Sequence, residues 1–209
     1  MPVTKSHLRA EILSARRSLT QQIHDREAAL LARHLDALAS PGAVVCAYIP
    51  VGTEPGSVAM VDDLARRGCT VLLPVAREDE NGTPRPLQWG RHVPGALVAA
   101  PFGLREPPPP WLPAEQVRDA ATVLVPALAV DRDGARLGRG AGYYDRTLSL
   151  AAARTMLVAV VRDDELVDHL PSEPHDVRMT HALTPQQGLL ALGRGGPAEC
   201  RGPGGGSST

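Results

Sequence analysis

The spacing of hydrophobic residues predicts helices in the N-terminal part of the chain. One apolar stripe predicts an amphipathic helix over residues 4–17, and another predicts a second helix over about 20–39. Ser18 and Gln21 have the spacing of a capping box between these two helices. A third helix is expected over residues 57–67, where a serine begins the pattern and a glycine follows it.

Short continuous apolar runs predict strands that are buried on both faces, as in parallel sheets. They cover residues 43–50, 70–76, 122–130 and 155–161. The first two runs enclose the third helix and therefore form a βαβ unit. Alternating buried strands and helices predict an α/β fold, a three-layer α/β/α domain with a mostly parallel sheet. Ligands in such folds bind at the carboxyl ends of the strands.

Two regions lack this alternation. Residues 77–121 are rich in proline and are predicted to be loops with short strands. The tail from Gly193 is rich in glycine, proline and serine, so it cannot bury enough surface and is expected to be disordered. The sequence thus predicts one domain over residues 1–192 and a tail over 193–209.

Composition narrows the class of protein. With 209 residues, 43% hydrophobic residues and a net charge of −1, the chain suits one soluble domain without a field that attracts nucleic acid or acidic lipid. Cys46, Cys69 and Cys200 form no C-x-x-C pair, which argues against a disulfide framework or a zinc site. No apolar run is long enough for a membrane span or a secretory signal. We therefore expect a cytoplasmic protein, and a monomer.

The segment between Arg136 and Asp145 carries the candidate chemistry. It follows a predicted strand and precedes a helix, and alternate glycines would let backbone N–H groups face an anion: Gly138, Gly140 and Gly142. Arg136 and Arg139 can bind phosphate oxygens through planar guanidinium groups, and Asp145 is a hard ligand suited to Mg²⁺. The segment matches neither the Walker A loop nor the Rossmann fingerprint. Phosphate binding is favoured over a plain tight connection.

The first predicted helix adds a possible second wall. Lys5, the only lysine of the chain, shares one helical face with Arg9 and Arg16. A solvated basic face is the simpler interpretation. The alternative is a phosphate clamp, because an ammonium group can follow a transferring phosphoryl group.

The run VPALAVDRDGARLGRGAGYYDRTL closely resembles the signature of the 5-formyltetrahydrofolate cyclo-ligases, also called methenyltetrahydrofolate synthetases. The segments KSHLR, YIPVGTEPGS, LPVA, PFGLREP and LPSEPHDVRMTHALT follow that family's order, so the resemblance covers about residues 3–185. It implies a Rossmann-like α/β fold and a ligase that joins ATP consumption to a reduced folate. Its small-molecule substrates would be ATP, as co-substrate, and 5-formyltetrahydrofolate, and its product 5,10-methenyltetrahydrofolate, with release of ADP and phosphate.

The resemblance also implies roles for the matching positions. The ATP-binding positions would be Lys5, Ser6, His7, Leu8, Arg9, Arg136, Leu137, Gly138, Arg139, Gly140, Ala141, Gly142, Tyr143 and Tyr144. The folate-binding positions would be Ile49, Glu54, Arg139, Gly140, Ala141, Gly142 and Tyr143. Lys5, Arg139 and Tyr143 would serve catalysis, and Asp145 and Asp176 would hold Mg²⁺. Ala141 occupies a position that is often Gly or Lys in the family.

Other residues have a structural and a functional interpretation. Tyr144 can line the folate pocket or pack on the sheet, and isolated aromatics such as Trp89 and Phe102 more often pack than bind. Arg105 and Glu106 are expected to form a local ion pair that supports their loop.

Two rival functions remain at the level of sequence. One is a non-catalytic nucleotide- or folate-binding regulatory module, which would be expected to lose the lysine or a metal carboxylate. The other is a sugar-phosphate isomerase or coenzyme A transferase, which would not need the glycine- and arginine-rich loop together with an N-terminal lysine.

Overall fold

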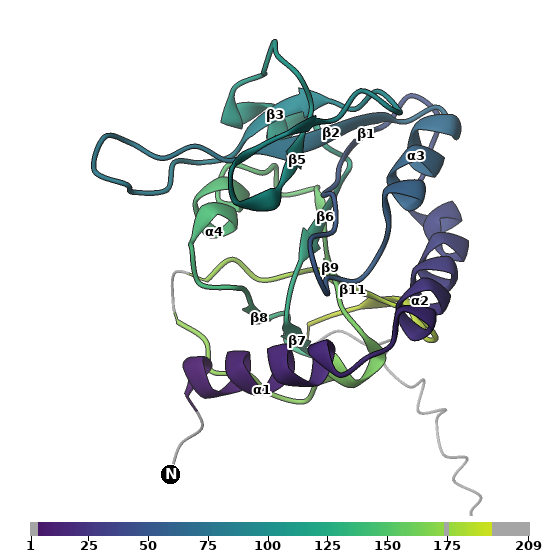
Figure 1. Ribbon diagram of the computed structural model, residues 1–209, viewed down its shortest axis with the longest axis vertical. Coiled ribbons are helices and arrows are strands. Elements are labelled where there is room, and N and C mark those ends of the chain that lie inside the picture. The colour runs from purple at the N-terminus through teal and green to yellow at the C-terminus, as the bar shows by residue number, and fades with distance from the viewer. Residues whose placement is uncertain (1–3, 174–175, 194–209) are drawn as a thin grey trace, which may run out of the picture.

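The computed structural model describes residues 4–173 and 176–193, except for the side chain of Phe102. The predicted packing of the Phe102 side chain and the predicted disorder of the tail beyond Gly193 therefore lie outside the described part of the chain. Figure 1 shows a twisted sheet in the centre with helices on both sides.

The described residues form a seven-stranded sheet with the order β12-β11-β9-β6-β1-β2-β3. The five inner strands are parallel, whereas the edge strands β3 and β12 run antiparallel to their neighbours. The strands are β1 (Val44–Cys46), β2 (Thr70–Val75), β3 (Gln88–Arg91), β6 (Thr122–Pro126), β9 (Met156–Val160), β11 (His181–Thr184) and β12 (Gly188–Ala191). The α/β class with a mostly parallel sheet is thereby confirmed.

Two small sheets surround the main one. A three-stranded sheet has the order β10-β7-β8, and β4 pairs with β5 in a hairpin. These strands are β4 (Val98–Ala99), β5 (Arg105–Glu106), β7 (Ala129–Asp131), β8 (Arg136–Leu137) and β10 (Leu166–Val167). The predicted strand over residues 122–130 is therefore wrong as one strand. It ends at Pro126, which pairs with Val160, and the chain then leaves the main sheet to form β7.

The first and third helices have nearly the predicted bounds, whereas the second, predicted over about 20–39, ends at Arg33 and is followed by a 3₁₀ turn. The helices are α1 (Lys5–Arg17), α2 (Gln21–Arg33), α3 (Val58–Arg66) and α4 (Tyr143–Leu148), with 3₁₀ turns η1 (Leu35–Ala37), η2 (Pro101–Gly103), η3 (Ala114–Asp119) and η4 (Asp163–Glu165). The predicted capping box is wrong. Because α2 begins at Gln21, the capping position is Thr20, whose hydroxyl accepts from the Ile23 N–H at 3.3 Å. Ser18 instead ends α1.

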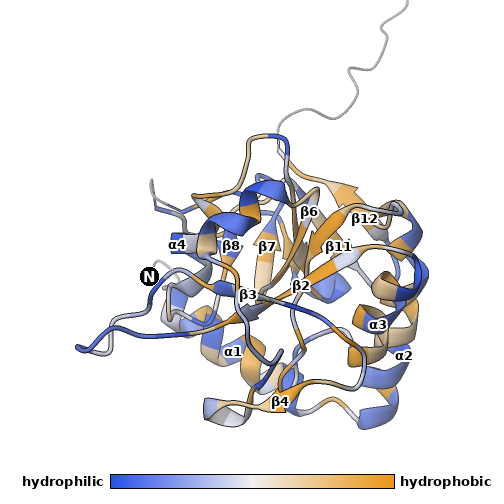
Figure 2. Ribbon diagram, turned by 90° about the horizontal axis from the view of Figure 1, so that it is seen from above, coloured by the Kyte–Doolittle hydropathy of each residue, from blue (hydrophilic) through white to orange (hydrophobic). Residues whose placement is uncertain are grey.

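Alternation along the strands divides the core into two parts. Val71 and Leu73 pack with α2 and α3, whereas Leu72 between them packs on the opposite face with Leu148 of α4. This is the pleat of a strand buried on both sides. Figure 2 shows the apolar strands between the helices. A smaller cluster joins Leu8 and neighbouring residues of α1 to β7 and β8.

The sheet also fixes where a ligand can bind. From β1 the chain crosses to β2 on one side, and β6 lies on the other side of β1, so the strand order reverses between β1 and β6. Loops that leave the carboxyl ends of two such strands diverge and leave a crevice. No helix in the described part of the chain has the length and apolarity needed to span a bilayer.

Candidate active site

A cavity of about 330 Å³ lies at the carboxyl ends of β1, β2 and β6. Residues after these strands line it, including Ile49, Ala76 and Ala127, and the segment from Gly138 to Asp145 forms another wall. This is the position expected from the reversal of strand order. We call it the site cavity.

The glycine- and arginine-rich loop (residues 136–145) connects β8 to α4. Gly140 has φ +101° and Gly142 has φ +82°, a left-handed conformation in which side chains other than that of glycine are strained. The guanidinium of Arg9 donates from Nε to the Gly138 carbonyl at 2.9 Å. A Cβ on Gly140 would lie 3.6 Å from Cζ of Arg9. The helix α1 therefore lies against this loop, as the two-wall hypothesis requires.

The predicted three-cation clamp on α1 divides into separate contacts. Lys5 donates to Asp176 at 2.9 Å and to Glu173 at 3.3 Å, and the bond to Asp176 is the main reason why the pKa of Lys5 is raised. Arg16 is buried and forms a two-pronged ion pair with Glu165, with both N–O distances at 2.6 Å. The interpretation of Arg16 as a solvated cation is therefore wrong. Arg16 lines the site cavity, so its part in a phosphate clamp stays a prediction.

The neighbours of Lys5 have different surroundings. Ser6 and His7 are exposed, and His7 pairs with Glu11 one turn away at 3.2 Å. The side chain of Leu8 packs against the small cluster with Leu137, which is itself buried. Among the described residues that line the site cavity, none comes from positions 5–9. Residues 5–9 therefore contact the loop through Arg9 without lining the site cavity.

Arg136 and Asp145 form an ion pair across the base of the loop. The guanidinium of Arg136 also lies over the ring of Tyr144, 5.8 Å from its centroid, and its side chain is only 5% exposed. Its Nε has no hydrogen-bond partner within residues 4–173 and 176–193. Arg136 therefore lines the site cavity in an orientation fixed by Asp145, while its unpartnered Nε is buried.

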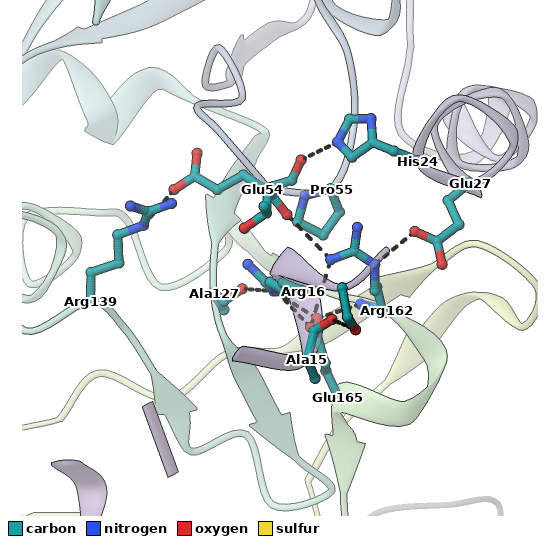
Figure 3. A network of polar contacts seen from close by, with 12 residues as sticks. Ala15, Arg16, His24, Glu27, Glu54, Pro55, Ala127, Arg139, Arg162 and Glu165 are labelled. Carbon is teal, nitrogen blue, oxygen red and sulfur yellow. Dashed lines mark hydrogen bonds and ion pairs between the residues drawn. The ribbon is translucent and has the colours of Figure 1, made fainter. Parts of the chain in front are cut away.

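Glu54 and Arg139 connect the two walls of the site cavity. Nε of Arg139 lies 3.0 Å from Oε1 of Glu54, and Nη2 donates to the Val51 carbonyl at 3.3 Å. The second carboxylate oxygen of Glu54 accepts from the Val51 N–H at 3.0 Å. Figure 3 shows Arg139 directed toward Glu54. The structure thus brings together the predicted ATP loop and the predicted folate contact, with Ile49 beside them.

Tyr143 lines the site cavity at the start of α4. Its hydroxyl donates to Oε1 of Glu78 at 3.0 Å, in the loop between β2 and β3 that projects from the body in Figure 1. Burial and then the neighbouring Glu78 raise the pKa of Tyr143, so the phenol stays protonated at neutral pH. Burial likewise raises the pKa of Tyr144. Both tyrosines act as neutral rings that carry one O–H donor.

The remaining candidates are mostly structural. Trp89 is fully buried in the core, which confirms the packing interpretation. Arg105 and Glu106 do not form the expected pair with one another among the described contacts. Glu106 instead pairs with Arg77 at 3.0 Å and accepts from the Ala76 N–H at 3.1 Å. As successive residues of β5, Arg105 and Glu106 point to opposite faces of that strand, so a direct pair is disfavoured.

The two predicted Mg²⁺ ligands, Asp145 and Asp176, each contact a different basic side chain. Asp145 pairs with Arg136, and Asp176 accepts from Lys5 and from the Glu173 N–H. Within the described residues, no group of three or more His, Cys, Asp or Glu side chains could hold a metal. Mg²⁺ that arrives with a nucleotide needs only one or two carboxylates, because phosphates and water complete its octahedron. The donor set therefore suits a metal carried by a phosphate chain better than a resident ion.

Local patterns did not reveal some buried charges near the site. Arg162 and Glu165 follow β9, and Glu165 accepts from Arg16, 149 residues away in the chain. Their one sequence signal was their place after a predicted buried strand, where polar residues reach the ligand end of the sheet.

The fold and site define a class: an α/β enzyme domain with a glycine- and arginine-rich loop facing a carboxylate across a cleft. The model of the 5-formyltetrahydrofolate cyclo-ligase family matches residues 2–185, and the chain belongs to this family of ligases. The 5-formyltetrahydrofolate cyclo-ligase of Mycolicibacterium smegmatis is 61% identical over 191 residues, covering 91% of this chain and 98% of that protein. The Escherichia coli K12 cyclo-ligase is 28% identical over 68% of this chain and 78% of its own length.

Solved structures agree with this assignment. The 5,10-methenyltetrahydrofolate synthetase of Aquifex aeolicus superposes with a TM-score of 0.74 at 25% identity, covering 97% of this chain and 100% of that one. The enzyme of the same name from Mycoplasma pneumoniae has a TM-score of 0.65 at 20% identity, covers 85% of this chain and 96% of its own, and supports the fold.

Proposed function

We propose that the protein converts 5-formyltetrahydrofolate and MgATP to 5,10-methenyltetrahydrofolate, ADP and phosphate. The observation that carries the proposal is the contact between Arg139 and Glu54 across the site cavity. It places a loop suited to phosphates within reach of a carboxylate suited to the N–H groups of a reduced pterin.

The chemistry begins with a poor electrophile, because the nitrogen lone pair of the N5 formamide is delocalised into its carbonyl. Attack of the formyl oxygen on the γ-phosphorus of ATP breaks the bond to ADP and leaves the oxygen as part of a phosphate leaving group. N10 then attacks the same carbon and closes a five-membered ring. Phosphate departs with the former formyl oxygen, and the N10 proton leaves with it.

This sequence needs positioning and charge compensation more than a protein nucleophile. Arg136 lines the site cavity and Arg139 is half exposed there, so their guanidinium groups can bind phosphate oxygens in the proposal. Lys5 stays protonated at neutral pH and lies one helical turn from Arg9, which holds the loop. Asp145 is the carboxylate of the loop that lines the site cavity, and in the proposal it binds Mg²⁺ carried by ATP.

Glu54 has the complementary role in the proposal. It is 9% exposed, and the Val51 N–H fixes one of its oxygens. A carboxylate held in this way can accept hydrogen bonds from the pterin and keep N10 near the formyl carbon. Tyr143, as a neutral phenol, can donate to or stack on the pterin at the opposite wall.

The test is to mix purified protein with 5-formyltetrahydrofolate and MgATP and to record the near-ultraviolet absorbance of the methenyl product together with ADP release. We expect both to rise in equal amounts. Glu54→Gln should abolish most of the rate, whereas Glu115→Gln, at an exposed position of η3, should match the wild type. Folded protein that binds both ligands without turnover would instead indicate the regulatory module.

A further inference from the structure

Three successive backbone carbonyls next to the site cavity are each held by a different side chain. Nη1 of Arg162 donates to the Thr53 carbonyl at 3.2 Å, and the Tyr48 hydroxyl donates to the Pro55 carbonyl at 2.6 Å. Between them, Nε2 of His24 lies 3.0 Å from the Glu54 carbonyl. A carbonyl only accepts, so His24 must carry its proton on Nε2. Figure 3 shows His24 and Arg162 reaching this segment from the side opposite Arg139.

The three donors come from separate parts of the fold and are themselves fixed. Tyr48 follows β1 and is 3% exposed, and Arg162 follows β9 and is 4% exposed. Nε of Arg162 donates to Glu27 of α2 at 2.7 Å. His24 lies one turn before Glu27 on the same helix. The segment is therefore tied to two strands and to α2.

We propose that His24, Arg162 and Tyr48 are positioning residues that fix Glu54 for the folate substrate. The inference rests on the proposed function, in which Glu54 contacts the pterin. Clamping the carbonyls on both sides of the Glu54 Cα fixes the direction of its Cα–Cβ bond, and the Val51 N–H then holds the carboxylate in one orientation. The reaction rate falls about 100-fold when a polar group that contacts the substrate is misplaced by about 1 Å.

His24 gives the sharpest test because it is not one of the described residues that line the site cavity. His24→Leu removes the donor, whereas His24→Gln keeps an N–H group on a side chain of similar length. We expect His24→Leu to lower kcat/KM for 5-formyltetrahydrofolate at least about 10-fold while the KM for ATP changes less than about 2-fold. His24→Gln should recover most of the loss. Tyr48→Phe, which keeps the buried ring, should resemble His24→Leu.

Thr155→Val is the matched control. The buried Thr155 hydroxyl donates to the Ala120 carbonyl at 2.9 Å, so this variant also loses a buried hydroxyl-to-carbonyl bond. Thr155 precedes β9, at the amino ends of the parallel strands, away from the site cavity. It should lower Tm by an amount similar to Tyr48→Phe and leave both KM values unchanged.

Calorimetric binding of 5-formyltetrahydrofolate completes the experiment. We expect weaker binding by His24→Leu than by the wild type. The inference would be overturned if both His24→Leu and Tyr48→Phe had the folate affinity and kcat/KM of the wild type. It would also be overturned if the KM for ATP and the KM for the folate rose equally, which would indicate general loosening. A wild type that neither binds nor converts the folate would instead refute the proposed function, and the inference with it.

Discussion

The buried ion pair between Arg16 and Glu165 gives a prediction whose size follows from its geometry. Both oxygens of Glu165 accept N–H groups of Arg16 at 2.6 Å, and one of them also accepts from the Arg162 backbone at 2.8 Å. The two side chains are 1% and 6% exposed. In Glu165→Gln, an NH₂ group replaces one oxygen and faces a donor whichever way the amide is turned.

The variant therefore leaves the charge of Arg16 buried without compensation. Removing one partner of a buried pair costs about 3–5 kcal/mol. For a domain of this size, about 1 kcal/mol corresponds to a shift of about 2–4 °C in Tm, so we expect Glu165→Gln to lower Tm by about 6–20 °C. Thermal unfolding followed by circular dichroism at pH 7 measures this shift.

Two further variants make the measurement decisive. Asp168 pairs with Arg132 at 3.2 Å on the surface, where the side chains are 95% and 65% exposed. Asp168→Asn should therefore cost at most about 1 kcal/mol. The double variant with Arg16→Met and Glu165→Leu should recover most of the loss, because it removes the uncompensated charge. If Glu165→Gln unfolded at the same temperature as Asp168→Asn, the reasoning from buried charge would be refuted.

Three further predictions address the nucleotide side, the backbone and pH. Lys5→Ala should raise the KM for ATP about 10–100-fold, which corresponds to the loss of one charge-assisted hydrogen bond. Tm should change by no more than a few degrees. An unchanged KM for ATP would contradict a phosphate role. Gly134→Ala should cost at least about 2 kcal/mol, because its φ is +87° and the new Cβ would lie 2.3 Å from a backbone oxygen. Gly82→Ala is its control, with φ +75° but no described atom within 4 Å, and should cost only about 1 kcal/mol in urea unfolding. Burial raises the pKa of Tyr48 and of the Cys46 thiol. Above about pH 9, the unfolded state therefore releases protons that the folded state keeps. The free energy of unfolding then falls by up to about 1.4 kcal/mol per pH unit for each group. Urea midpoints that stay constant from pH 8 to about pH 10.5 would contradict this direction.

Local periodicity predicted the elements whose identity depends on near neighbours. The apolar stripe of α1 and the buried runs of β2 and β9 appear in the structure within one or two residues of the predicted bounds. The glycine- and arginine-rich loop was also visible, because its glycines and charges are contiguous. What the loop binds in the folded chain, such as Arg9 at Gly138, depends on contacts across 129 residues.

Contacts at long sequence separation explain the errors. Arg16 has the spacing of a solvated helix face, and only the folded chain brings Glu165 to it. Residues 181–191 form the hairpin of β11 and β12, and β11 joins the main sheet by pairing with the distant strand β9. Periodicity within one segment contains no information on such a partner. Edge strands and buried ion pairs are therefore the features that sequence patterns predict least.

The charged residues of the site cavity show how the site can select an anionic ligand without a strong net positive electrostatic field. In the described part of the chain, four arginines and three carboxylates line it, and Arg136 and Arg139 each pair with one of those carboxylates. The carboxylates reduce long-range attraction for any anion, but they also fix the guanidinium planes. A phosphate chain then meets donors that are already oriented, so little free energy is lost in ordering them when the ligand binds. Asp145 and Glu54 perform this positioning from opposite walls. The carboxylates that the proposed function assigns to the metal and to the folate therefore also orient the two arginines that it assigns to the nucleotide.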